Sequence, residues 1–108
     1  MKEYARIVYT EAVEHIERHI GEPLQVADIA KAIHVSESGL QRSFHACVNC
    51  SVHVYLLRAR MQKAMKLLQQ GAKVGDVAQS CGFPNRNHFS YCFKKEFGIT
   101  PSQAKKMP

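Results

Sequence analysis

LQVADIAKAIHVS, residues 24–36, is followed later in the chain by a similar stretch, AKVGDVAQSCGFP, residues 72–84. Asp28 matches Asp76 at an offset of 48 positions (76 − 28). In each copy a short helical pattern leads into a tight turn and then into a second helical pattern, and this order is typical of a helix-turn-helix motif. The repeat therefore predicts two helix-turn-helix motifs in one chain of 108 residues.

The similarity continues through the second helix of each motif. Phe44 matches Phe93 at an offset of 49 (93 − 44), so the second copy has one extra residue in its turn, and Pro84 is the expected insertion. Leu40 lies four residues before Phe44, as Phe89 does before Phe93, and this spacing places both members of a pair on one helix face. We expect these four side chains to pack inward.

The hydrophobic periodicity of the remaining sequence predicts an all-α fold of about seven helices. We expect a first helix-turn-helix subdomain over residues 1–51, a long connector helix over 52–70 and a second subdomain over 71–108. The individual helices are expected at about 3–20, 26–32, 37–48, 52–70, 76–80 and 86–97, with a short last one from 101 and a frayed basic tail. Because no low-complexity linker is present, the connector is expected to hold the two subdomains rigidly.

Several residues suit the ends of these helices. Ser36 and Asn85 precede the second helix of each motif, and their side-chain oxygens can accept hydrogen bonds from free amides of the first turn. Asn49 and Gly98 follow the same two helices and can adopt the left-handed conformation that ends a helix. Gly82 permits a positive φ in the second turn.

The charge balance favours a polyanionic partner. Lys and Arg number 15 against 9 Asp and Glu, which gives a net charge of +6 and a pI near 9.3. A basic domain of this kind is typical of nucleic-acid binding, although a merely soluble basic surface has the same composition. Hydrophobic residues make up 45% of the chain, which is enough for a core. The sequence has neither a membrane span nor a signal peptide, so we expect a cytoplasmic protein.

A helix that reads DNA needs an apolar inner side and a polar or basic outer side. Arg42 can bridge guanine O6 and N7, and Gln41 can bridge adenine N6 and N7, each contact being worth about 1–3 kcal/mol of discrimination. The residues predicted to face the groove are Ser38, Gln41 and Arg42 in the first motif and Arg86, Asn87, Ser90 and Tyr91 in the second. An ordinary solvated helix face carries similar residues, but the duplication favours base reading.

Three further residues lie beside these predicted reading faces. His45 is expected near the DNA backbone, and Lys94 and Lys95 are expected either to contact phosphates or to solvate their helix. No cofactor is expected.

Cys47 and Cys50 form a CxxC pair that supports an alternative hypothesis, a thiol- or zinc-responsive sensor. Zinc would need Cys81 and Cys92, or histidines, as its other ligands. The 31 positions between Cys50 and Cys81 (81 − 50) exceed the spacing of zinc ribbons, and no second CxxC exists. The simplest interpretation is four reduced thiols in a reducing compartment.

No catalytic motif competes with these interpretations. The sequence has no glycine-rich phosphate loop, nucleophile elbow or HExxH motif, so we do not expect an enzyme. Asp28 and Asp76 are equivalent in the repeat, which predicts a shared structural role such as pairing with a buried base, for which Arg58 or Arg60 is available. A helical module that binds an acidic protein partner is a further alternative.

The residues from about Ile16 to Lys105 resemble the DNA-binding domain of the AraC family of bacterial transcription regulators. The most specific part is FSYCFKKEFGITPSQ, residues 89–103, together with LQRSF at residues 40–44. The resemblance implies seven helices in two subdomains and two recognition helices in successive major grooves, roughly 34 Å apart. The family's base-reading positions match the seven residues predicted above.

The resemblance also implies partners. It predicts transcription activation through contact with RNA polymerase, and a fused or separate ligand-binding or dimerisation domain. Two features depart from the family pattern. Tyr91 stands where many members have Arg, which suggests contact with a thymine methyl or a phosphate. HACVNC, residues 45–50, replaces a stretch that is commonly rich in Lys and Glu and ends in Gly.

Overall fold

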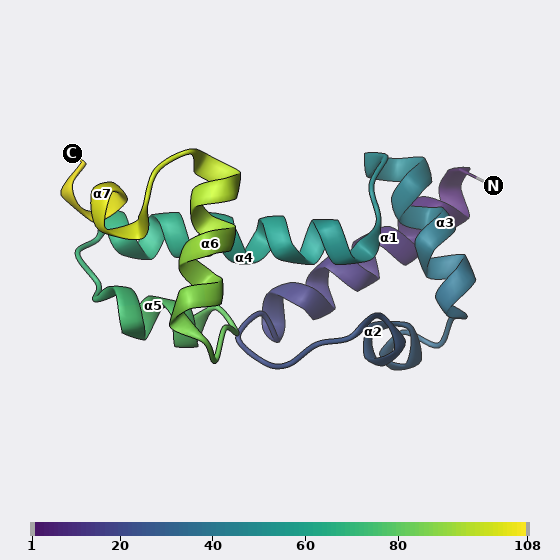
Figure 1. Cartoon of the computed structure of the whole chain (residues 1–108). Helices are drawn as coiled ribbons and strands as arrows, with labels where there is room; N and C mark the ends of the chain where they lie inside the picture. The colour runs from purple at the N-terminus through teal and green to yellow at the C-terminus, as the bar shows by residue number, and fades with distance from the viewer. Residues whose placement is uncertain (1, 108) are drawn as a thin grey trace. The chain divides into compact units, whose positions relative to one another are not determined.

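The computed structural model describes residues 2–107, and every regular element in this range is an α-helix. The helices are α1 (Lys2–Arg18), α2 (Val26–Ala32), α3 (Glu37–Val48), α4 (Val52–Gln69), α5 (Val74–Ser80), α6 (Arg86–Phe97) and α7 (Pro101–Lys106) (Figure 1). The predicted all-α fold with two helix-turn-helix motifs is confirmed, with α2 and α3 as the first motif and α5 and α6 as the second. Over residues 2–107, no helix has the length and hydropathy of a membrane span.

The chain divides into two compact units, residues 1–57 and residues 58–108. The boundary falls inside α4, which corresponds to the connector helix predicted from the sequence. Unit 1 therefore contains α1, α2, α3 and the start of α4, and unit 2 contains the rest of α4 with α5, α6 and α7. Each unit has its own helix-turn-helix motif.

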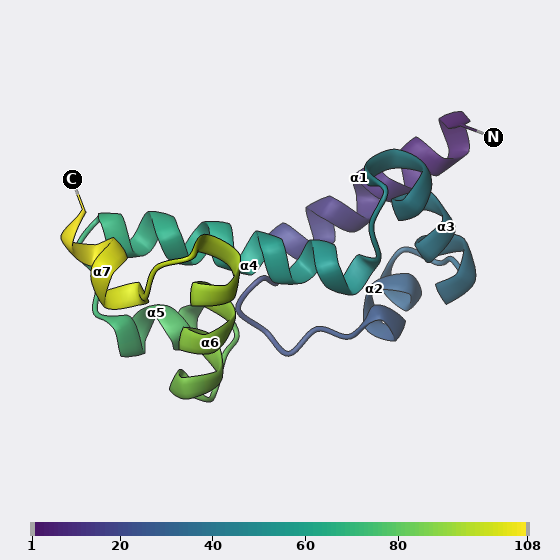
Figure 2. The same cartoon turned by 45° about the horizontal axis from the view of Figure 1, so that its top comes forward.

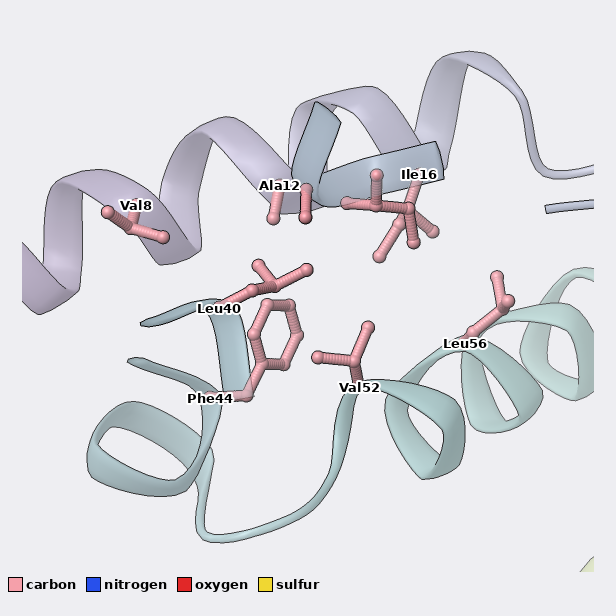
Figure 3. Packing of buried hydrophobic residues seen from close by; sticks show 9 residues of the cluster. Val8, Ala12, Ile16, Leu40, Phe44, Val52 and Leu56 are labelled. Carbon is pink, nitrogen blue, oxygen red and sulfur yellow. The ribbon is translucent and has the colours of Figure 1, made fainter. Parts of the chain in front are cut away.

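The core of unit 1 forms where α1, α2, α3 and the first turns of α4 meet. Figure 3 shows the aliphatic side chains of α1 directed toward Leu40 and Phe44 of α3. The Phe44 ring packs edge to face against Tyr9 and Tyr55, with centroid distances of 5.0 and 5.3 Å. The buried residues are Val8, Ala12, Ile16, Ile29, Ala30, Leu40, Phe44, Val52 and Leu56. Leu40 and Phe44 thus have the inward role that their spacing predicted.

The core of unit 2 is built around aromatic rings. Phe83, in the turn between α5 and α6, packs against Phe89 with a centroid distance of 5.5 Å, and Phe89 contacts Phe93 at 5.8 Å. The buried hydrophobic residues are Met61, Ala64, Leu68, Val77, Ala78, Cys81, Phe83, Phe89, Phe93 and Ala104. The prediction that Phe89 and Phe93 pack inward is confirmed.

The four predicted helix-capping residues are confirmed. Ser36 Oγ accepts a hydrogen bond from the backbone N–H of Gly39 at 3.0 Å. Asn85 Oδ1 accepts from two backbone N–H groups of the first turn of α6, at 2.9 and 3.1 Å. Asn49 and Gly98 end α3 and α6 in the left-handed conformation, with φ of 55° and 76°.

Three boundaries differ from the prediction. α1 ends at Arg18 rather than near residue 20, because the chain turns there toward Gly21. α5 begins at Val74, before Asp76, since the extended residue Lys73 already accepts the first helical hydrogen bond. The tail expected to fray is helical through residue 106, because Thr100 caps α7 and Ala104 is buried.

Candidate DNA-binding surface

The outer face of α3 is polar and exposed. Ser38, Arg42 and His45 are exposed, whereas Leu40 and Phe44 on the opposite side are fully buried. The predicted reading residues Ser38 and Arg42 and the predicted backbone residue His45 are therefore all accessible to a ligand. This division of α3 into a packed side and a free polar side is what a recognition helix requires.

Gln41 departs from this pattern. Its side chain is half-buried, and its Oε1 accepts a hydrogen bond from the backbone N–H of Val52 at 3.1 Å. Val52 is the first residue of α4, whose first N–H groups have no partner within the helix. A bidentate contact with adenine would require the same Oε1 to accept from the base as well. Base reading by Gln41 stays a prediction, and the contact that the structure contains is with α4.

The outer face of α6 carries the second predicted set. Arg86, Asn87 and Tyr91 are exposed, and Ser90 is half-buried at the edge of the face. The inner side of the same helix is formed by the buried phenylalanines described above. All four predicted residues therefore belong to one helix of unit 2, with Ser90 less accessible than the other three.

Tyr91 is the most prominent aromatic group on this face, with 65% of its surface exposed. The Nζ atom of Lys95 lies 5.8 Å from the centroid of its ring, within the range of a cation–π contact. Lys94 and Lys95 are both exposed. This arrangement offers an apolar ring surface beside two positive charges, which suits the methyl group of thymine next to a phosphate.

The role predicted for Asp28 and Asp76, pairing with a buried base, is corrected by the structure. Both carboxylates are exposed, and each is the third residue of its short helix, α2 or α5. Asp28 Oδ2 accepts a hydrogen bond from the backbone N–H of Gln25 at 3.2 Å. A negative charge in the first turn also interacts favourably with the helix dipole. Asp28 therefore stabilises the start of α2 through this hydrogen bond, and Asp76 holds the equivalent position in the first turn of α5.

The four cysteines are free thiols. Cys47 is exposed and Cys50 is half-buried, so the CxxC pair is at least partly accessible. Burial raises the pKa of the Cys81 and Cys92 thiols above the ordinary value, and nearby cations only partly oppose it. Within residues 2–107, no three His, Cys, Asp or Glu side chains gather in an arrangement that could hold a metal ion. The sensor hypothesis therefore depends on Cys47 and Cys50 alone.

Comparison with known proteins agrees with this architecture. The model of the family described as "Helix-turn-helix domain" matches residues 29–107. The chain is 36% identical over 92 residues to the HTH-type transcriptional regulator GbdR of Pseudomonas aeruginosa, covering 84% of this chain and 25% of that protein. The chain thus spans about a quarter of that relative's length.

Solved structures show the same fold. A transcriptional regulator of the AraC-type DNA-binding-domain proteins from Chromobacterium violaceum is similar with a TM-score of 0.87 and 33% identity over 98% of both chains. The DNA-binding domain of AdpA, solved in complex with a target DNA, has a TM-score of 0.83 at 23% identity, covering 90% of this chain and 88% of that one. The second likeness concerns the fold alone. The chain belongs to the helix-turn-helix domain family of AraC-type transcriptional regulators, which is a family of DNA-binding domains and not of enzymes.

Proposed function

We propose that this chain binds specific sequences of double-stranded DNA by inserting α3 and α6 into major grooves, and that it thereby regulates transcription. The observation that carries the proposal is the repeated division of each helix. In both motifs, two inward side chains at i and i+4 are fully buried, and basic or amide side chains are exposed on the opposite side. The net charge of +6 supplies attraction to the DNA backbone.

Unit 1 supplies one set of reading residues. Arg42 is assigned the main specific contact, a bidentate pair with guanine, because it is exposed and its guanidinium has the matching geometry. Ser38, in the first turn of α3, is placed to contact a base edge or a phosphate. His45 is assigned to the backbone.

Unit 2 supplies the second set. Asn87 is assigned to adenine and Tyr91 to a thymine methyl, with Ser90 as a weaker contributor because it is half-buried. Lys94 and Lys95 are assigned to phosphates. Arg86, the first residue of α6, can reach either a base or the backbone.

We further propose that the two helices occupy successive major grooves of a single duplex, about 34 Å apart. Two units with separate cores, each presenting one reading helix, support this mode without requiring a dimer. Three further proposals rest on the family. They are transcription activation through RNA polymerase, an intracellular location, and an additional ligand-binding or dimerisation domain. This chain spans about a quarter of the length of GbdR, which supports the last of these.

Selection from a random duplex library tests the proposal directly. Sequences should be enriched, and their affinity should fall by orders of magnitude between about 50 and 200 mM salt, as expected for several phosphate contacts. Arg42→Ala should cost about 1–3 kcal/mol on the selected site and little on random DNA. Arg18→Ala is the matched control, because it removes an equal charge from an exposed residue on α1 of the same unit. Equal losses for both variants, or no enrichment, would contradict sequence-specific binding.

A further inference from the structure

Unit 2 contains a basic pocket that the sequence patterns do not reveal. It is formed by Lys73 just before α5, Arg86 at the start of α6, and Lys105 and Lys106 at the end of α7. Residues of α7 and of the first turn of α5 line it together, and Figure 2 shows α7 near the beginning of α5. We call this site, with a volume of about 760 Å³, the Lys73–Lys106 pocket.

The residues around the pocket indicate an anionic ligand. Four cationic side chains and one carboxylate, that of Asp76, give the lining a net charge of +3 (4 − 1). Pockets for small organic molecules are mostly lined by hydrophobic and aromatic side chains. Here Val74 is the only apolar side chain among the described residues that line the site. Lys and Arg are the usual protein ligands of phosphate oxygens.

The helix that carries Lys105 and Lys106 is capped at its start and packed against the core of unit 2. Thr100 Oγ1 accepts a hydrogen bond from the backbone N–H of Gln103 at 3.1 Å, and Gln103 Oε1 accepts one from the backbone N–H of Thr100 at 2.8 Å. Ala104, immediately before Lys105, is fully buried. Because the helix is capped and anchored, the backbone that carries both charges needs no ordering when a ligand binds.

We propose that the Lys73–Lys106 pocket binds backbone phosphates of the same DNA that α6 reads. This inference rests on the function proposed above. Arg86 links the two sites, since it lines the pocket and directly precedes Asn87 of the reading face. The pocket volume, within the roughly 300–1,000 Å³ typical of ligand sites, has room for a sugar-phosphate segment. In this proposal Arg86 contacts a phosphate and not a base. It thereby fixes the position of α6 along the duplex.

The test compares Lys105→Ala/Lys106→Ala with wild type in duplex titrations followed by fluorescence anisotropy. Phosphate contacts stabilise all duplexes alike, so affinity for the selected site and for random DNA should fall by the same factor, about tenfold near 100 mM salt. Each phosphate contact contributes roughly 0.9 to the magnitude of the slope of log K against log salt. Loss of one or two contacts should therefore reduce that magnitude by about 1 to 2. Lys73→Ala, on a different element, should act in the same direction, which separates loss of the pocket from unfolding of α7.

The matched control is Arg58→Ala/Lys66→Ala, which removes the same charge from two exposed residues of α4 outside the pocket. If the control lowers affinity and slope as much as the α7 variant does, the pocket assignment is wrong and only overall charge matters. Titration with inorganic phosphate and with AMP gives a second arm. Saturable AMP binding that the α7 variant loses, without change in duplex affinity, would overturn the assignment to DNA. Wild type that binds no duplex would instead remove the proposed function itself.

Discussion

Gln41 of the first recognition helix accepts a hydrogen bond from the backbone N–H of Val52, the first residue of α4, at 3.1 Å. The contact ties α3 to the start of the following helix. Ser51 Oγ accepts a second hydrogen bond there, from the backbone N–H of Val54 at 3.1 Å. Two side chains therefore satisfy amides at the beginning of α4 that the helix itself leaves free.

Replacing Gln41 should consequently affect stability before it affects recognition. Gln41→Ala is expected to lower the free energy of unfolding by about 0.5–1.5 kcal/mol, because the Val52 amide loses its acceptor. Gln41→Glu retains a side-chain oxygen and should be less harmful, since a negative charge near a helix start is favourable. Urea unfolding of both variants measures this. If Gln41→Ala is as stable as the wild type, Gln41 does not stabilise the start of α4, and base reading is the role left for it.

Gly82, in the turn between α5 and α6, leaves no room for a larger residue beside the Arg60 side chain. Gly82 has φ of 85°, and a Cβ added there would lie 3.0 Å from the Arg60 guanidinium carbon. That guanidinium lies over the Phe83 ring, 6.0 Å from its centroid, and burial lowers the pKa of Arg60. Gly82→Ala should destabilise the protein by roughly 1–3 kcal/mol through backbone strain and displacement of Arg60.

Gly75 supplies the matched control for that substitution. It is the second residue of α5, and apart from its chain neighbours and the backbone of its own helix, no atom lies within 4 Å of the position of an added Cβ. Gly75→Ala should therefore stabilise the protein by about 0.5–1 kcal/mol through helix propensity. Thermal unfolding of the two variants should give shifts of opposite sign. A loss of stability in both, or in neither, would contradict the described turn geometry.

Tyr55 should make stability sensitive to alkali. Burial, reinforced by Tyr9, raises its pKa from 10.0 to about 12. A phenol whose folded pKa is raised contributes stability that is complete below the unfolded value near 10 and lost as the pH rises toward 12. The free energy of unfolding should fall across this window in the wild type and fall less in Tyr55→Phe. Parallel curves for the two proteins would show that Tyr55 is not protected by the fold.

Cys47 and Cys50 test the sensor alternative. Because no other ligand set gathers with them among the described residues, Cys47→Ser/Cys50→Ser should leave zinc content and DNA affinity unchanged in both reducing and oxidising buffer. Elemental analysis and duplex titration provide the two readouts. A redox-dependent affinity in the wild type that the double variant lacks would favour the sensor hypothesis.

Local features of the sequence were sufficient to predict most of the fold. Ser36 and Asn85 cap helices through amides no more than three residues away, and apolar residues at i and i+4 indicate which face of a helix is buried. Residues close in the sequence therefore determine both the caps and the buried faces. The partner of Gln41 is eleven residues away across a turn, and its position depends on how the left-handed Asn49 redirects the chain. Periodicity alone contains no information on such a contact.

The basic pocket of unit 2 was unpredictable for a similar reason. Lys73 and Lys106 lie on either side of the whole second motif in the sequence, and they come together because the start of α5 and the end of α7 line one pocket. The error over Asp28 had a different origin. Equivalence in the repeat correctly indicated a structural role, but an acidic residue at the third helical position is explained by helix capping, which requires no buried base.

Hydroxyl-radical and guanine-methylation footprinting on the library-selected site will show whether α3 and α6 read one duplex together. We expect two protected major-groove segments on one face of the DNA, separated by one helical turn of about 10 base pairs. Arg42→Ala should remove methylation protection from one segment only. A single protected groove, or protection lost from both segments at once, would contradict the claim that each helix occupies its own groove.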